Sequence, residues 1–240
     1  MKNFNGFTLA EVLITLGVIG VVAAMTMPTL IQKQNEKATV TKLKKVYTVL
    51  SQAYLMIQKD YGEPMGWLQT NDNSEIGNLF AKYMKISKNC GTGKGCFSPD
   101  DIKGLDGTTH ASHNSRSEMS KLITADGYSV SFRIHNKNCN DIRGTNKQLE
   151  NVCGWVTVDI NGNKKPNTFG KDIFEFNINK YGIYPYGTEF EKQGFPFETF
   201  CLSSSGLGRG NSCTAWVLYN ENMDYLHCND LSWSGKHKCE

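Results

Sequence analysis

The chain lacks the short motifs that mark common enzymes and metal sites. No G-x-S-x-G nucleophile elbow occurs, and the glycine-rich run from Gly91 to Gly95 does not fit the G-x-x-x-x-G-K-[S/T] phosphate loop. There is no C-x-x-C, and no H-x-x-x-H accompanies the cysteines, so zinc has little basis. The sequence therefore predicts no enzyme activity, no catalytic residue, no cofactor and no metal.

Ionisable residues are almost missing from one stretch, residues 7–31, where only Glu11 occurs. As a helix this stretch is about 37 Å long, which exceeds the roughly 30 Å hydrocarbon core of a bilayer. A carboxylate at membrane depth is costly and needs a partner. Lys2 precedes the stretch and Lys33 lies about 33 Å further along a helix, so the partner must come from another molecule.

The residues around Glu11 read Gly6-Phe7-Thr8-Leu9-Ala10-Glu11-Val12-Leu13-Ile14 and resemble the processing motif of type IV prepilins and type II secretion pseudopilins. The resemblance implies cleavage between Gly6 and Phe7 by a prepilin peptidase, which also methylates Phe7. It implies that Glu11 pairs with the terminal amine of a neighbouring subunit, and that Pro28 kinks the helix. A cleaved secretory signal or a plain signal anchor would not explain a glutamate at this distance from a Gly-Phe junction.

This resemblance divides the chain into a leader, residues 1–6, a transmembrane and assembly helix, residues 7–31, and a pilin-like globular domain, residues 32–240. Lys2 favours a cytoplasmic N-terminus, so we expect a single-pass protein of the bacterial inner membrane with a periplasmic domain, extracellular once assembled. Expected partners are membrane lipid, like or related pilin subunits, the peptidase and an inner-membrane assembly platform. The net charge of +3 is too small to suggest nucleic acid.

Eight cysteines all follow the membrane stretch, and an even number in an exported domain indicates disulfides. The short separations favour the local pairs Cys90–Cys96 and Cys139–Cys153.

The four C-terminal cysteines allow two schemes. A hairpin about Asn220-Glu221 would place Cys213 opposite Cys228 and leave Cys201 with Cys239, which resembles the C-terminal disulfide region of type IV pilins. The alternative pairs Cys201 with Cys213 and Cys228 with Cys239.

Apolar residues continue past Pro28 at three- and four-residue spacing, which predicts an amphipathic second half of the same helix, ending near Tyr61-Gly62. An independent helix after a linker is the alternative. Asp72 and Glu75 predict the cap of a short following helix. The stripe of the long helix consists of Leu43, Val46, Tyr47, Leu50, Tyr54 and Ile57.

Strand patterns predict a hairpin turning at Asp126-Gly127, with strands at 122–125 and 128–134, and further strands at 155–160 and 172–178. Together with the long helix, these predict an α+β fold: a helix with a transmembrane half and an amphipathic half, packed on an antiparallel sheet of about four strands, followed by a loop-rich, disulfide-linked C-terminal region.

Two features of the loops have competing interpretations. His110 and His113 could be half of a metal site, but solvated loop histidines are favoured. Asp159, Asn161 and Asn163, with Asp172, alternate like the first ligands of a calcium loop, although Lys164-Lys165 and the missing closing glutamate favour an ordinary turn within residues 159–172.

These observations favour a structural subunit of a type IV pilus-like or type II secretion pseudopilus filament. The alternative is an exported binding or adhesive domain that uses a pilin-type anchor.

Overall fold

The computed structural model describes residues 8–64, 73–203 and 206–239. The chain divides into two compact units, Met1–Ala38 and Thr39–Glu240. Helix α1 (Leu9–Tyr61) contributes its first half to one unit and its second half to the other. The continuous helix confirms that the apolar stretch and the amphipathic stripe belong to one element.

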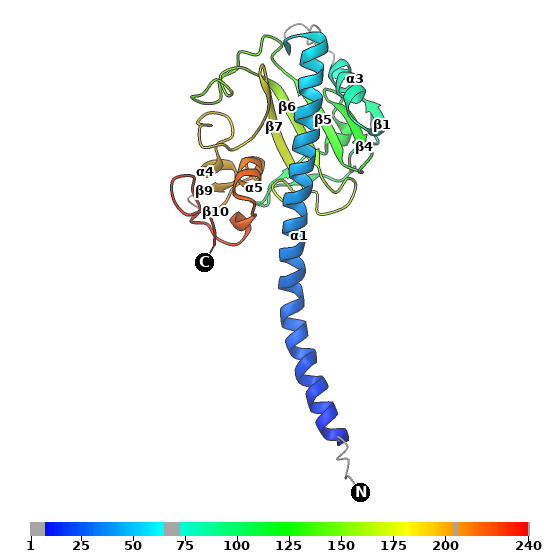
Figure 1. Cartoon of the computed structure of the whole chain (residues 1–240), viewed down its shortest axis with the longest axis vertical. Coiled ribbons are helices and arrows are strands. Elements are labelled where there is room, and N and C mark those ends of the chain that lie inside the picture. The colour runs from blue at the N-terminus through cyan, green and yellow to red at the C-terminus, as the bar shows by residue number, and fades with distance from the viewer. Residues whose placement is uncertain (1–7, 65–72, 204–205, 240) are drawn as a thin grey trace. The chain divides into compact units, whose positions relative to one another are not determined.

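The second half of α1 lies along one face of the antiparallel sheet (Figure 1). Its predicted stripe is buried: Leu43, Leu50 and Ile57 are fully enclosed, and the Tyr47 ring stacks on Phe176 with the centroids 5.6 Å apart. The helix ends as expected, because Gly62 takes φ 79° and donates its N–H to the carbonyl of Gln58.

The sheet has six strands within the described residues, not the four predicted, and every neighbouring pair is antiparallel. The hairpin between β4 and β5 turns at Asp126-Gly127, as expected, with Gly127 at φ 83°. The two missed strands are the edges. One contains Lys88 and Asn89 without apolar alternation, and the other is short and ends in proline, which an edge tolerates. In spatial order the strands are β1 (Ile86–Gly91), β4 (Ser120–Thr124), β5 (Ser129–Ile134), β6 (Val152–Asp159), β7 (Ile173–Asn179) and β8 (Gly182–Pro185).

Helix α3 (Asn73–Tyr83) is the predicted short helix, and it packs on the sheet through Phe80, which stacks on Phe132 of β5 at 4.5 Å. Of its predicted capping pair, Asp72 lies outside the described residues. The remaining elements are short: β2 (Ile102–Lys103), β3 (Thr109–His110), η1 (His113–Ser115), α4 (Phe197–Phe200), β9 (Leu202–Ser203), β10 (Gly206–Leu207) and η2 (Asp224–Leu226).

The C-terminal hairpin prediction is wrong. Residues 214–220 form a helix, α5 (Thr214–Asn220), which ends where Glu221 takes φ 56°. A short, continuously apolar run does not distinguish a buried strand from a buried helix, and Trp216 and Val217 are both fully enclosed. Trp216 stacks on Phe197 of α4 at 4.5 Å, a contact between segments that are far apart in sequence.

The structure contains four disulfides, and the C-terminal pairing depends on helix α5. Cys90–Cys96 and Cys139–Cys153 form as expected. In the C-terminal region the alternative scheme holds, with Cys201–Cys213 and Cys228–Cys239, because without the hairpin Cys213 and Cys228 no longer face each other. All eight cysteines are paired, which confirms a disulfide-linked C-terminal region.

Candidate functional site

The first half of α1 presents an almost uninterrupted exposed apolar surface. Leu9, Leu13, Ile14, Ile19 and Leu30 are each 60–78% exposed, and none of the apolar side chains described between residues 8 and 39 belongs to the core of the globular unit. The helix is long and apolar enough to cross a membrane. An exposed apolar surface of this extent marks contact with lipid or with other proteins.

Glu11 lies in the first turn of α1, where it forms a reciprocal capping box with Thr8. The backbone N–H and the hydroxyl of Thr8 both donate to Glu11 Oε2 at 2.8 Å, and the Glu11 N–H donates back to Thr8 Oγ1 at 3.3 Å. The T-x-x-E pattern of residues 8–11 carried this signal in the sequence. The carboxylate therefore has a local partner within its own helix.

The other predicted positions of the N-terminal segment are less defined. Gly6 and Phe7, the expected cleavage and methylation residues, lie outside the described residues. Pro28 lies inside α1, which continues through it. A kink at Pro28 stays a prediction, as does pairing of Glu11 with another subunit.

The interpretation of His113 as a solvated loop residue is wrong, whereas His110 is only partly covered. His113 is only 4% exposed, and its Nδ1 lies 3.2 Å from Ser131 Oγ on β5. Burial, with Arg116 and Lys121 nearby, lowers the pKa of His113 to about 3. His110 is half-buried, with its ring edge on Phe169 at 5.7 Å. No local sequence pattern predicts the burial of His113.

The loop of residues 159–172 uses its acidic residues to hold its own backbone. Asp172 accepts from the N–H groups of Asn167 and Thr168 at 2.8 and 2.6 Å and from the amide of Asn161 at 2.7 Å. Burial and the neighbouring Asp172 raise the pKa of Asp159 to about 8, so Asp159 holds a proton at neutral pH. Asp172 is already supplied with donors, which is the arrangement of an ordinary polar turn. Among the described residues no group of His, Cys, Asp or Glu has the geometry to hold a metal.

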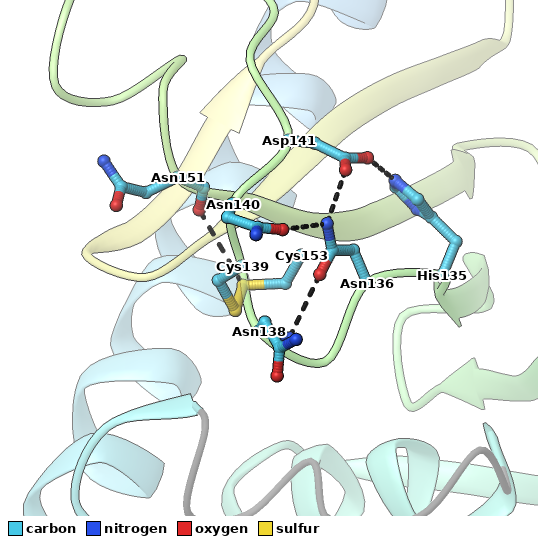
Figure 2. A network of polar contacts seen from close by, with 8 residues as sticks. All are labelled: His135, Asn136, Asn138, Cys139, Asn140, Asp141, Asn151 and Cys153. Atoms are coloured by element: carbon cyan, nitrogen blue, oxygen red, sulfur yellow. Dashed lines mark hydrogen bonds and ion pairs between the residues drawn. A yellow bond between two sulfur atoms is a disulfide. The ribbon is translucent and has the colours of Figure 1, made fainter.

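A polar loop closed by Cys139–Cys153 lies beside the sheet (Figure 2). The amide of Asn136 donates to Asp141 Oδ1 at 2.5 Å, and the other oxygen of Asp141 pairs with the ring of His135. Burial raises the pKa of Asp141, but the hydrogen bonds from Asn136 and His135 outweigh this and leave it below its usual range. The network fixes an asparagine-rich loop without regular structure.

A long apolar N-terminal helix, whose second half packs on an antiparallel sheet, is the fold that the prepilin resemblance implies. Residues 1–27 match the model of the prokaryotic N-terminal methylation motif, the type IV prepilin-like signal for cleavage and methylation. The motif and the apolar helix fit a protein anchored in the inner membrane.

Residues 29–207 match the model of the Family of unknown function (DUF6613), and the chain belongs to that family. No curated protein and no solved structure matches it. The motif points to a structural protein handled by the prepilin machinery, and the family match adds no activity.

Proposed function

We propose that the chain is a structural subunit of a type IV pilus-like or type II secretion pseudopilus filament. Prepilin peptidase cleaves it between Gly6 and Phe7 and methylates Phe7. Residues 7–31 hold the subunit in the inner membrane until an assembly platform transfers them into a bundle of like helices. The support is the methylation motif together with an apolar helix surface that nothing in the described chain covers.

The proposal rests mainly on the position of Glu11, a carboxylate within the apolar stretch of α1. Transfer from lipid to a helix bundle changes apolar burial little, so specificity rests on the polar group that changes partner. Both bonds from Thr8 go to Oε2 of Glu11, which leaves Oε1 able to accept from the methylated amine of a neighbouring subunit. The capping box thus orients the carboxylate without saturating it.

Three variants separate the charge of Glu11 from its capping role. Glu11→Ala removes both, Glu11→Gln keeps an oxygen that Thr8 can bond, and Thr8→Val removes the side-chain hydroxyl but keeps the carboxylate. We expect all three to insert and to be cleaved, both glutamate variants to be lost from sheared surface filaments, and Thr8→Val to be incorporated. Immunoblots of membrane and sheared fractions measure this.

Glu36→Gln is the matched control, since it removes a carboxylate from the same helix outside the apolar stretch. It should enter filaments normally. Incorporation of Glu11→Gln into filaments at the level of the unchanged chain would contradict the assembly role of Glu11.

An exported binding domain on a pilin-type anchor is the second candidate function. The globular unit contains a cleft lined by three arginines, which a purely structural subunit does not need. Intact ligand binding by a protein never found in filaments would favour this candidate.

A further inference from the structure

A cleft of about 180 Å³ lies on the face of the sheet opposite α1. Successive side chains of a strand point to opposite faces, so Trp155 of β6 and Glu175 of β7 face away from the core that Val156 and Phe176 build with α1. Loop residues, among them Arg143, Phe195 and Arg209, form the rest of the lining. Its lining residues include His110, His113, Arg116, Arg143, Arg209 and Asn211.

The distribution of arginine singles out this cleft. The chain has four arginines among 26 basic residues, and three of them, Arg116, Arg143 and Arg209, line the cleft. The fourth, Arg133, lies over the Trp155 ring at 4.9 Å. Elsewhere the chain uses lysine for positive charge. Arginine is preferred where a planar, forked donor must bind an oxyanion with two parallel hydrogen bonds or stack on a ring.

Two of these guanidinium groups form no close ion pair with a protein carboxylate among the described residues, although both keep the pKa of Glu175 lower than burial alone would. Within the described residues Arg116 forms an ion pair with Glu118 at 3.5 Å, whereas Arg143 and Arg209 form none within 4 Å. The Nε of Arg209 is buried without a hydrogen-bond partner. A buried donor without a partner costs free energy, which a bound oxygen atom would recover.

Asn211 supplies a hydrogen-bond acceptor to the same cleft. It is only 3% exposed, its side chain is hydrogen-bonded to Glu175, and its Oδ1 has no partner. Glu175 is itself buried and accepts from Thr157 Oγ1 at 3.2 Å. A ligand that fits here must therefore offer hydroxyl donors as well as an anionic group.

Aromatic side chains form the walls. Tyr186 and Phe195 stack at 4.9 Å, and the guanidinium of Arg143 lies 5.4 Å from the Phe195 ring. Trp155 and Phe169 are further aromatic residues of the lining. Flat apolar walls fit the C–H face of a ring, and the volume is below the roughly 300–1,000 Å³ typical of sites for drug-sized ligands.

We propose that this cleft binds one carboxylated sugar ring, the terminal or exposed residue of an acidic saccharide. Arg143 and Arg209 bind the carboxylate, and the aromatic walls pack against the sugar ring. Asn211 and Glu175 accept hydrogen bonds from its hydroxyl groups. A bare inorganic anion would leave the walls and acceptors unused, and a neutral sugar would leave the forked donors of Arg143 and Arg209 without an oxyanion to bind. The proposal deepens the binding role of the globular unit and does not depend on filament assembly.

Binding to the full chain in detergent micelles tests the proposal by isothermal titration. The probes are methyl β-D-glucuronide and a methyl α-sialoside, each carrying a carboxylated ring. Methyl β-D-glucoside presents the ring alone, and acetate and inorganic phosphate present the anion alone. We expect at least one acidic sugar to bind at least tenfold more tightly than the glucoside, acetate or phosphate.

Arg209→Lys and Arg143→Lys keep the positive charge but lose the planar, forked donors of the guanidinium group. We therefore expect each to weaken binding of that sugar at least tenfold. Arg133→Lys is the matched control and should leave affinity within twofold. Thermal unfolding of each variant checks that the domain stays folded. Binding of neither acidic sugar, equal binding of the glucoside, or binding of phosphate as tight as that of the sugar would each overturn the proposal, whether or not the chain forms filaments.

Discussion

At the residue scale, His113 shows most directly how the fold changes side-chain chemistry. Its folded pKa of about 3 lies below the roughly 6.5 of an unfolded histidine, because the ring is buried beside Arg116 and Lys121. Below about pH 6.5 the His113 ring is therefore protonated in the unfolded chain but stays neutral in the folded chain. The contribution of His113 to stability is present above about pH 6.5 and is lost as pH falls toward 3.

This shift predicts a pH-dependent difference between the unchanged chain and His113→Gln. The free energy of unfolding that His113 contributes should fall by about 2 kcal/mol between pH 7 and pH 5, and the variant should lack that loss. Chemical denaturation of both proteins at both pH values gives the difference. Burial raises the pKa of Glu175 and of Glu191 to about 7, so these two acids raise the free energy of unfolding as the pH falls from 7 to 5, opposite to His113. Both acids are present in both proteins, so subtracting the pH-dependent change of the variant from that of the unchanged chain removes their contribution. Equal pH slopes for the two proteins would contradict a buried neutral His113.

At the element scale, the two faces of the second half of α1 differ sharply in burial. Leu50 is fully enclosed, while Leu55 is 58% exposed on the same helix. We expect Leu50→Ala to lower the free energy of unfolding by about 2–5 kcal/mol, because it leaves a cavity against the sheet. Leu55→Ala, the matched control, should change it by less than about 0.5 kcal/mol. Similar losses from both substitutions would mean that the stripe does not pack on the sheet.

The two C-terminal disulfides should also differ. Cys201 and Cys213 are both fully buried, whereas Cys228 and Cys239 are only partly buried. Both bridges close loops of similar length, so their effect on the unfolded chain is similar. We expect the double serine variant C201S/C213S to lose more stability than C228S/C239S, because it buries two hydroxyl groups. Peptide mapping of the unreduced protein checks the pairing, and a Cys213–Cys228 peptide would contradict it.

At the scale of the whole molecule, Thr39–Glu240 contains its own core and all four disulfides. We expect this fragment, exported to an oxidising compartment, to fold without residues 1–38 and to unfold cooperatively near the temperature of the full chain in detergent. Calorimetry measures both. A fragment without a cooperative transition would show that the apolar half of α1 is needed for folding.

Calcium should leave the thermal midpoint of the full chain unchanged at neutral pH. Asp172 already accepts three hydrogen bonds, and Asp159 keeps its proton, so the loop of residues 159–172 offers few free charged oxygens. A midpoint that rises by several degrees on adding calcium, and falls again with a chelator, would restore the calcium interpretation.

Much of the fold followed from local patterns. The stripe from Leu43 to Ile57 predicts the packed half of α1, and Asp126-Gly127 fixes the central hairpin. The edge strands were missed because Lys88 and Asn89 show no alternation. The C-terminal helix was missed because a short run of apolar residues suits a buried helix as well as a strand, and the disulfide scheme depended on that choice.

The sequence by itself determined the N-terminal segment, because charge depletion, length and the Gly-Phe junction with Glu11 are properties of contiguous residues. Only the tertiary structure decided the sites of the globular unit. His113, Arg143, Glu175 and the neighbouring residues Arg209 and Asn211 come from four separate parts of the chain, and their meeting depends on loops that fold over the second face of the sheet. Periodicity records which face a side chain takes, but it carries no information about which distant loop will cover that face.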